Sequence, residues 1–556
     1  MAAQEGAREP GLVTVVGASA AGTAFEWYDF FVFASLTPTL GKHFFTGVNE
    51  ATSFILALAT FALGFFVRPL GALVFGMFGD MKGRKVAFLI TITMMGLATV
   101  AVGLIPDARQ IGIIAPLILV ALRVLQGFAL GGEYGGAAIY VAEHAPDKSR
   151  GALTGWIQTS AAFGLVGALG VILGTRFLVG DAVFEDIGWR IPFLLSAVLL
   201  ALSLWIRLKL NESPAFKRME SEGSERRAPF RETFLRWSNL KYVILVLFGV
   251  MIAQGAVWYC AFFYAKFFMT QILKLDAATA DGLMAIATLA SAALYIVFAW
   301  LSDKIGRKPV MLFGMILAVV VFIPTTPFCA FRLMTEAAYP DQAAAQARSP
   351  VTVIADPADC ALQFDPVGKA KFASSCDIAK SVLTNAGISY SNQAAPKGAV
   401  ASVRIGTATV VSRDARSQPD AEAKKTRAAV SAQIGVALKA AGYPPKPDAK
   451  KVDKTRLLEI LLVLVVAATA LYGPQAAALV ELFPTRVRYT GMGVPYNIGT
   501  GWVGGFLPAA AFAMMAATGD IYFGLWYPVA FTAVAIVVCM LFWPETKGRD
   551  LHTVET

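Results

Sequence analysis

The chain has 556 residues, of which 56% are hydrophobic and 15% are charged. Soluble domains carry about 45–50% apolar and about 25% charged residues, so this composition indicates an integral membrane protein. The net charge of +10 does not indicate nucleic-acid binding, because the basic residues lie in short loops between apolar stretches. His43, His144 and His552 are scattered and no Cys-x-x-Cys pair occurs, which leaves no candidate metal site.

The N-terminus, Met1 to Pro10, is short and mixed in charge and lacks the basic region and cleavage site of a signal peptide. We therefore expect the first apolar stretch to remain as a membrane span. A helix needs about 20 apolar residues to cross the bilayer. The sequence predicts twelve such spans, with approximate limits 12–38, 51–78, 86–105, 111–143, 152–178, 189–208, 241–270, 279–301, 309–331, 457–482, 489–517 and 521–543.

Basic residues predict the orientation of these spans, because cytoplasmic loops of membrane proteins are enriched in lysine and arginine. Such residues follow the even-numbered spans, and the loop after the sixth span holds the largest group of them. Short loops on the other side are poor in lysine and arginine. We therefore expect both termini in the cytoplasm and the long polar segment 332–456 in the periplasm.

A charged motif occurs twice, as Gly79-Asp80-Met81-Lys82-Gly83-Arg84-Lys85 and as Ser302-Asp303-Lys304-Ile305-Gly306-Arg307-Lys308. Each copy ends one apolar stretch and precedes another, which indicates two copies of one membrane-embedded unit that rock about a central site. The predicted division is an N-terminal six-helix bundle (1–208), a cytoplasmic central loop (209–240), the first three helices of a C-terminal bundle (241–331), a periplasmic inserted module (332–456), and the last three helices with a cytoplasmic tail (457–556).

The inserted module is predicted to be a small α/β unit. Residues 351–354 and 402–405 are rich in β-branched residues and favour strands, whereas residues 377–386 and 421–441 favour helices. Cys360 and Cys376 are candidate disulfide partners in an oxidising exterior. The alternative is a pair of free buried thiols. Substrate capture and assembly are both open as roles of the module.

Several segments carry a family resemblance. Gly76 to Lys85 resembles the signature loop of the major facilitator superfamily. Residues 22–31, 68–71, 123–136 and 544–549 are similar to the bacterial metabolite:proton symporters, which include permeases for α-ketoglutarate, shikimate, citrate, proline/betaine and haloacids. The resemblance implies an all-α membrane protein, with twelve helices in two pseudo-symmetric bundles of six. The large insertion resembles the branch of haloacid and small monocarboxylate permeases.

Charged side chains inside a span usually mark a transport pathway. Glu26 and Asp29 share one helix face, and we expect them to form the proton-coupling site; the alternative is a carboxylate neutralised by a static ion pair. Arg123, Gln126 and Glu133 share a face of the fourth span. Arg123-x-x-Gln126-Gly127 resembles the superfamily motif in which the arginine is linked to proton transfer, so Arg123 and Glu133 join the predicted coupling set. Arg123 is expected to bind an anion or to exchange partners with Asp29 or Glu133, and a static pair is the alternative.

Further polar and aromatic residues are candidates for the substrate pocket, and for those of the seventh and eleventh spans plain helix packing is an equally good explanation. The candidates are Tyr28, Arg123, Gln126, Tyr134, Gln254, Trp258, Tyr259, Tyr496, Asn497 and Trp502. Arg68, late in the second span, is expected to extend to the cytoplasmic interface, and a substrate contact is the less favoured role.

Charged residues at the cytoplasmic ends of helices are predicted to form a latch that closes that side of the transporter. The predicted latch consists of Asp80, Gly83, Arg84, Glu143, Arg150, Asp303 and Arg307. The alternative is that these residues only anchor the topology.

The sequence contains no Walker loop, clustered metal ligands or nucleophile elbow, so neither an enzyme nor an ATP-driven pump is expected. We expect a monomeric symporter without a cofactor, which moves a proton and a small organic anion, monocarboxylate or haloacid-like, across the bacterial inner membrane. The alternatives are a dicarboxylate or shikimate symporter, a symporter of zwitterionic osmolytes such as proline or betaine, and a transporter-like sensor.

Overall fold

The computed structural model describes residues 12–46, 50–208, 212, 229–361, 372–444 and 446–551. The expectations for Met1 to Pro10 and for most of the central loop 209–240 lie outside these described residues.

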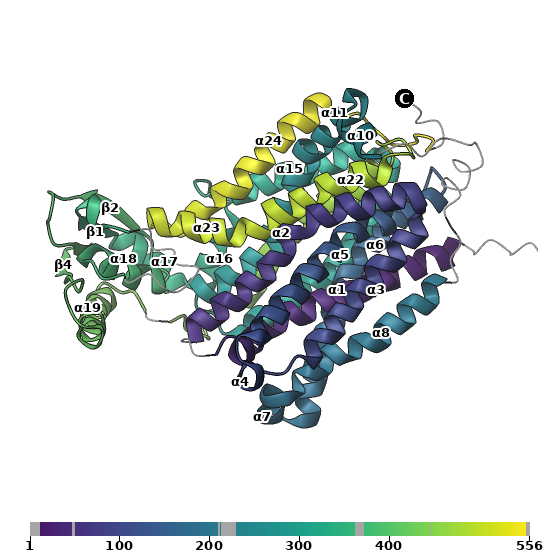
Figure 1. Ribbon diagram of the computed structural model, residues 1–556. Coiled ribbons are helices and arrows are strands. Elements are labelled where there is room, and N and C mark those ends of the chain that lie inside the picture. Colours follow the sequence, from purple (N-terminus) through teal and green to yellow (C-terminus); the bar gives the residue numbers. More distant parts are fainter. Residues whose placement is uncertain are drawn as a thin grey trace, which may run out of the picture.

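Six long helices form the N-terminal bundle (Figure 1). They are α1 (Leu12–Phe44), α2 (Glu50–Lys82), α3 (Arg84–Leu104), α5 (Ile114–His144), α6 (Arg150–Val179) and α8 (Arg190–Leu208). Three short elements connect them: α4 (Ala108–Ile111), α7 (Asp181–Val183) and the π-helix η1 (Phe184–Gly188).

The C-terminal bundle is built from more interrupted helices. Its first span follows α10 (Pro229–Phe234) and runs through α11 (Trp237–Val246), η2 (Leu247–Met251), α12 (Ile252–Tyr259), η3 (Cys260–Tyr264), α13 (Ala265–Phe267) and η4 (Phe268–Ile272). The others are α14 (Ala277–Ile305), α15 (Arg307–Phe322), α20 (Lys454–Tyr472) with α21 (Gln475–Val480), α22 (Arg488–Asn497) with η6 (Ile498–Gly504) and α23 (Gly505–Thr518), and α24 (Trp526–Phe542) after η7 (Phe523–Leu525).

In the described part of the chain, ten helices are long and apolar enough to cross a membrane. The other two predicted spans correspond to α1, with 33 residues, and α15, with 16 residues. The ninth span ends at Phe322 rather than at 331, and α16 (Ala330–Ala338) follows as a separate helix. Pro324 and Pro327 lie in the break, where they cannot donate the backbone bonds of a continuing helix.

The two copies of the charged motif make the same turn between helices. Gly83 joins α2 to α3 and Gly306 joins α14 to α15, each with a φ of 110°. A side chain at either position would be strained in this backbone conformation. The repeated motif therefore encodes a repeated corner, one in each bundle.

The inserted module contains a four-stranded sheet of order β2-β1-β3-β4, with β1 parallel to β2 and the other pairs antiparallel. Its elements are α17 (Pro340–Arg348), β1 (Val351–Ala355), η5 (Pro357–Asp359), α18 (Ser375–Asn385), β2 (Tyr390–Ala394), β3 (Ser402–Ile405), β4 (Ala408–Val411) and α19 (Asp420–Ala440). It has a hydrophobic core of its own, which includes Val353, Leu383, Val403 and Ile434.

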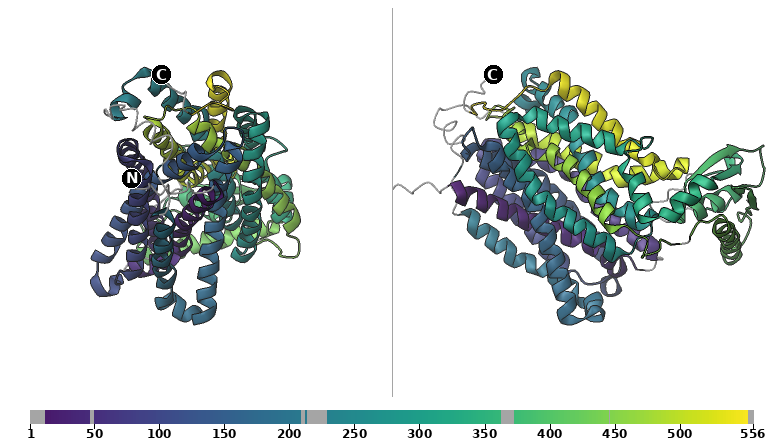
Figure 2. Two further views of the ribbon diagram at one scale, coloured as in Figure 1. Left: turned by 90° about the vertical axis from the view of Figure 1, so that its right-hand side faces the viewer. Right: turned by 180° about the vertical axis from the view of Figure 1, so that it is seen from behind.

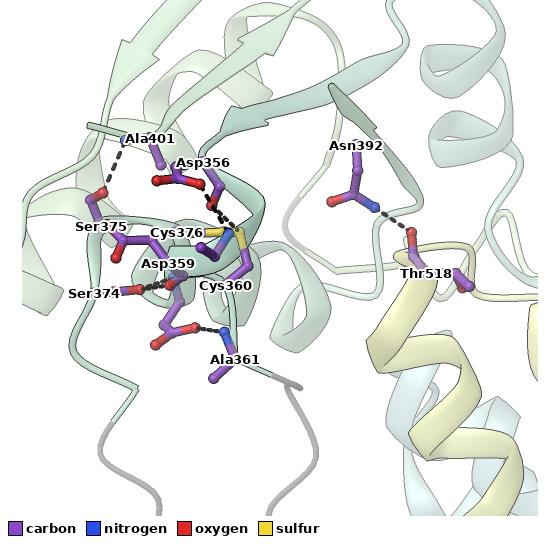
Figure 3. Close-up of a disulfide and its surroundings, with 12 residues drawn as sticks. Asp356, Asp359, Cys360, Ala361, Ser374, Ser375, Cys376, Asn392, Ala401 and Thr518 are labelled. Carbon is purple, nitrogen blue, oxygen red and sulfur yellow. Dashed lines mark hydrogen bonds between the residues drawn. A yellow bond between two sulfur atoms is a disulfide. The ribbon is translucent and has the colours of Figure 1, made fainter. Parts of the chain in front are cut away.

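A disulfide joins Cys360, after η5, to Cys376 in α18 (Figure 3). The edge strand β2 meets the loop between α23 and η7: the Tyr390 N–H donates to the carbonyl of Gly519 (2.9 Å), and Asn392 Nδ2 donates to the carbonyl of Thr518 (2.7 Å). The module is therefore attached to the C-terminal bundle.

The module lies at one end of the helices and α10 at the other (Figure 1), and the view from behind in Figure 2 again shows the module at one end. We call these the module end and the latch end. The duplicated corners at Gly83 and Gly306 belong to the latch end, because α3 and α15 both begin there.

Candidate functional site

The latch end is closed by contacts between the two bundles. Asp80, in the last turns of α2, accepts hydrogen bonds from the backbone N–H groups of Tyr489 (3.2 Å) and Thr490 (2.9 Å) in the first turn of α22. Asp303 occupies the equivalent place in α14. It accepts hydrogen bonds from the backbone N–H groups of Gly151 (2.9 Å) and Ala152 (2.7 Å) in the first turn of α6. Each aspartate thus caps a helix of the opposite bundle, where unpaired N–H groups attract negative charge.

Arginines hold both aspartates in place. Arg84 donates to Asp80 at 2.9 Å and to the carbonyl of Thr485 at 2.7 Å, and Arg307 donates to Asp303 at 2.6 Å. Arg307 is fully buried and also pairs with Glu481 at 3.1 Å. Each cap is therefore part of a buried charged network.

Two further ion pairs cross between the bundles. Glu143, at the end of α5, accepts from Arg488 at 2.7 Å, and Glu481 accepts from Arg150 at 3.0 Å. The structure thus brings together all the residues of the predicted latch, whereas sequence reasoning missed Glu481 and Arg488. The signal was present, since Glu-x-x-Pro-x-x-x-Arg occurs at 143–150 and again at 481–488.

An aromatic cluster lies between the bundles and is formed by Trp27 and Phe30 of α1, Phe61 and Phe65 of α2, and Trp258 and Tyr259 of α12. Ring centroids are 5.9 Å apart for Trp27 and Trp258 and 5.7 Å apart for Phe65 and Tyr259, so both bundles contribute to one cluster. Trp258 also donates to the hydroxyl of Tyr295 at 2.9 Å. Trp258 and Tyr259 are thus placed at the interface, as a pocket role requires.

Arg123 lies against this cluster. Its guanidinium carbon is 4.4 Å from the ring centroid of Phe33 and 4.6 Å from that of Phe61. Its Nη1 donates to Gln126 at 3.1 Å, while its buried Nε has no hydrogen-bond partner among the described residues. Arg123 therefore pairs with neither Asp29 nor Glu133 in this conformation. It forms no ion pair with any described carboxylate, so the alternative of a static ion pair is not seen.

Arg68 is not at a lipid interface, contrary to the expectation that it extends to the cytoplasmic surface. It is 6% exposed, and its Nε donates to Asn497 Oδ1 at 3.0 Å, because α2 packs directly against α22. Asn497 in turn donates to the carbonyl of Gly131 on α5 at 2.9 Å. This contact joins the two bundles midway along the helices.

The remaining pocket candidates lie in different places. Tyr496 is buried and shares a hydrogen bond with Tyr472 (2.8 Å), and Gln254 is buried with its Oε1 unpartnered among the described residues. Trp502 is 40% exposed and donates to the carbonyl of Phe66. Tyr28 instead donates to the carbonyl of Pro192 within the N-terminal bundle. Glu133 is buried on α5, and the side chain of Tyr134 lies outside the described part of the chain.

The carboxylates of α1 face α8 rather than the space between the bundles. Glu26 accepts from Arg207 Nη1 at 2.9 Å, and Asp29 accepts from Ser196 Oγ at 2.6 Å. Glu26 thus forms the kind of ion pair that the sequence offered as the alternative to proton coupling. Asp29 forms no ion pair with a described residue. Arg207 lies inside the sixth apolar stretch (189–208), at its end next to the basic loop, so the sequence does not single it out as a buried partner.

Hydrogen bonds connect Arg123 to Thr99 on α3. Arg123 donates to Gln126 Oε1, and Gln126 Nε2 donates to Thr99 Oγ1 at 2.9 Å. The Thr99 hydroxyl donates to the carbonyl of Met95 at 3.0 Å and lies close to Asp29. Gln126 and Thr99 therefore lie between Arg123 and Asp29.

The chain has clear relatives among known proteins. Residues 14–232 and 439–556 match the family described as "Sugar (and other) transporter", and residues 136–352 match "MFS/sugar transport protein". The chain is 36% identical over 321 residues to the proline/betaine transporter of Escherichia coli K12, covering 56% of this chain and 63% of the relative. It is 35% identical over 322 residues to the glycine betaine/proline/ectoine/pipecolic acid transporter OusA of Dickeya dadantii, with the same two coverages.

These matches span less than two thirds of each relative's length. Among solved structures, the proton:xylose symporter XylE superposes with a TM-score of 0.63 at 16% identity, covering 97% of this chain and 98% of that one. This likeness shows the fold. The prediction of a major facilitator fold with a small α/β insertion is confirmed.

Proposed function

The chain belongs to the family of sugar and other transporters in the major facilitator superfamily, and on that premise we propose that it moves a small zwitterionic osmolyte, of the proline or betaine kind, together with a proton. It is a multi-pass membrane transporter and not an enzyme. The proposal places it in a bacterial inner membrane, with the latch end in the cytoplasm and the module in the periplasm.

The observation that carries this proposal is an arginine beside an aromatic cluster. The aromatic rings of Trp27 and Trp258 suit the cationic ammonium end of a betaine. Arg123, whose Nε has no partner in the described part of the chain, suits the carboxylate. A betaine or proline carries both groups on a small frame, so one site serves both ends of the substrate.

The organic-anion interpretation of the sequence uses only half of this arrangement. A monocarboxylate would employ Arg123 and leave the indole rings of Trp27 and Trp258 without a cation. The names of the relatives, which are proline/betaine transporters, also support the osmolyte alternative over the organic anion. We therefore place the zwitterion first and keep the monocarboxylate as the competitor in the test.

Alternating access in this proposal begins from a closed latch. Opening the latch end requires loss of the Asp80 and Asp303 caps and of the Glu143–Arg488 and Arg150–Glu481 pairs. The Arg68–Asn497 contact would separate with them. Because every one of these contacts joins one bundle to the other, rigid-body rocking of the bundles breaks them together.

Proton coupling is assigned to Asp29 and Glu26, with Arg123 as the residue that senses the substrate. A substrate carboxylate that draws Arg123 away from Gln126 would change the hydrogen bonds of Gln126 and Thr99, and so the polar surroundings of Asp29. Substrate occupancy and the charge on Asp29 would be linked in this way.

The test is uptake by cells that lack their own osmolyte carriers, with and without a protonophore. Labelled glycine betaine, proline, acetate, chloroacetate, α-ketoglutarate and shikimate would be compared at equal concentration. We expect protonophore-sensitive uptake of betaine or proline, which excess unlabelled acetate does not inhibit. Uptake of the carboxylates alone, with no inhibition by betaine, would refute the osmolyte assignment.

A further inference from the structure

Two polar stripes face each other inside the N-terminal bundle. On α8, Ser196, Ser203 and Arg207 are each at most 1% exposed, and their spacings of seven and four residues put them on one helix face. On α1, Glu26 and Asp29 form the opposing stripe, with Glu26 against Arg207 and Asp29 against Ser196. Ser203 lies between these two contacts on α8.

Four buried atoms in this stretch have no hydrogen-bond partner among the described residues. They are Arg207 Nε and Nη2, whose guanidinium lies over the ring of Phe88, and Glu26 Oε2 and Ser203 Oγ. Buried polar atoms are nearly always hydrogen-bonded, to protein or to ordered water. Their isolation therefore indicates a missing small polar partner.

A cavity lies against Glu26 and Ser203. It leaves about 10 Å³ for the centre of a water molecule and is lined by both α1 carboxylate residues and by Ser203, with Met95 and Gly96 of α3 and Leu200 of α8 among its apolar walls. A cavity needs about 10–15 Å³ by this measure to hold one water. The size thus fits a single water molecule, and Glu26, Asp29 and Ser203 supply polar partners for it within otherwise apolar walls.

We propose that one water binds in this cavity and bridges Glu26, Ser203 and Asp29, so that the three residues and the water form a buried proton relay. The inference rests on the proposed proton coupling. It adds a water that transfers the proton and Ser203, which positions that water. The relay lies inside the N-terminal bundle, apart from the aromatic cluster at the interface.

The relay moves one proton without changing the number of water molecules. A protonated Asp29 donates its carboxyl proton to the water oxygen, and the water donates one of its own protons to Glu26 Oε2. Asp29 ends as a carboxylate, Glu26 as a neutral acid, and the water is restored. Ser203 Oγ holds the water in line between the two carboxyl groups.

Protonation of Glu26 has a structural consequence because its charge holds Arg207 through a single hydrogen bond of 2.9 Å. The charged or titratable groups that face this pair are Asp29 on α1 and Tyr489 on α22, whereas the cavity wall from α3 is apolar. Tyr489 donates to the carbonyl of Gly132 across the closed latch. A proton on Glu26 therefore weakens the hold on Arg207 near Tyr489, which contacts the opposite bundle.

The test separates proton-driven transport from substrate exchange in proteoliposomes that contain the full chain. Ser203→Val removes the hydroxyl and fills the cavity, whereas Ser203→Ala removes only the hydroxyl. The control is Ser19→Ala, in a buried serine of α1 whose Oγ has no partner among the described residues and which does not line the cavity. We expect pH-gradient-driven uptake of labelled glycine betaine to fall about 10²-fold in Ser203→Val, as for loss of a positioned proton-transfer group. Exchange of betaine without a gradient should remain at the wild-type rate.

The two hypotheses fail in different ways. If wild-type protein shows no pH-driven uptake, the proposed function is wrong and the relay falls with it. If wild-type protein is pH-driven and both Ser203 variants equal the Ser19→Ala control, only the relay is overturned. Should Ser203→Val fail to fold, Ser203→Ala decides the matter, because it adds no volume: slower gradient-driven uptake with normal exchange supports the relay, and wild-type uptake overturns it.

Discussion

Asp80 and Asp303 make the same contact from opposite bundles: each accepts two backbone N–H groups at the start of a helix in the other bundle. Each is also held by the arginine four residues later in its own motif. The duplicated sequence thus produces a duplicated cap. When a cap opens, its aspartate loses the backbone N–H donors of the opposite bundle and keeps the arginine of its own.

Removing one partner of a buried latch pair should favour the open state. Glu143→Gln leaves Arg488 without its charge partner, and breaking a buried pair costs about 3–5 kcal/mol. We expect faster maleimide labelling of a cysteine introduced at Val487, which is buried at the start of α22. The control is Glu336→Gln, in an exposed pair with Arg456 at 3.5 Å, which should leave labelling unchanged. Equal labelling of all variants would show that the pair does not hold the latch.

The aromatic cluster should bind the ammonium end of the substrate. Trp258→Ala removes one ring face, and a desolvated cation–π contact contributes about 2 kcal/mol, so the affinity for glycine betaine should fall roughly 30-fold. Trp258→Phe should retain much of the affinity. The matched control is Trp237→Phe, on a side chain that is 69% exposed. Unchanged betaine binding in Trp258→Ala would place the ammonium elsewhere.

The disulfide should stabilise the module without being needed by the bundles. Cys360 and Cys376 are 16 residues apart, a loop for which cross-linking contributes about 3 kcal/mol. A double Cys→Ser variant should therefore lose protease resistance in residues 340–444 first. Reductant should sensitise the wild-type module and have no added effect on the double variant. A module equally resistant with and without the disulfide would contradict this prediction.

Acid should weaken the module through Asp356. Backbone N–H groups of Gly398 and then Ala358 donate to this carboxylate and lower its pKa below the ordinary 3.8. Because the folded-state pKa is the lower one, the stabilisation is complete above the unfolded pKa and is lost as pH falls from about 4 through the folded value. Asp356→Asn should flatten the pH dependence of module proteolysis between pH 5 and about 3. An unchanged profile would assign the acid sensitivity to another group.

The sequence predicts those parts of the fold that depend on local pattern. Apolar length predicts the spans, and the repeated Asp-x-x-Gly-Arg-Lys motif predicts the corners at Gly83 and Gly306. The strand β2 escapes prediction, because Tyr390 to Ala394 is largely polar and exposed and is fixed by pairing with β1 and with the α23 loop.

The candidate site was harder to predict, because it depends on how helices distant in the sequence are rotated against each other. Arg207 is near the end of its predicted span and Arg68 lies in the second half of its own. A single sequence does not distinguish an arginine that extends to the membrane surface from one paired inside. The Asn497 contact of Arg68 spans 429 positions, and the Glu26 contact of Arg207 spans 181. Both follow only from the packed structure.

The most direct test of the central claim is proton entry that depends on the osmolyte. Proteoliposomes with purified protein and an internal pH dye would receive glycine betaine at equal pH on both sides, with the membrane potential clamped at zero. Symport predicts internal acidification that begins on addition of betaine, that is absent in Asp29→Asn, and that is absent in protein-free vesicles. Betaine entry without acidification would contradict proton coupling, and acidification by acetate or chloroacetate transport but not by betaine would contradict the osmolyte assignment.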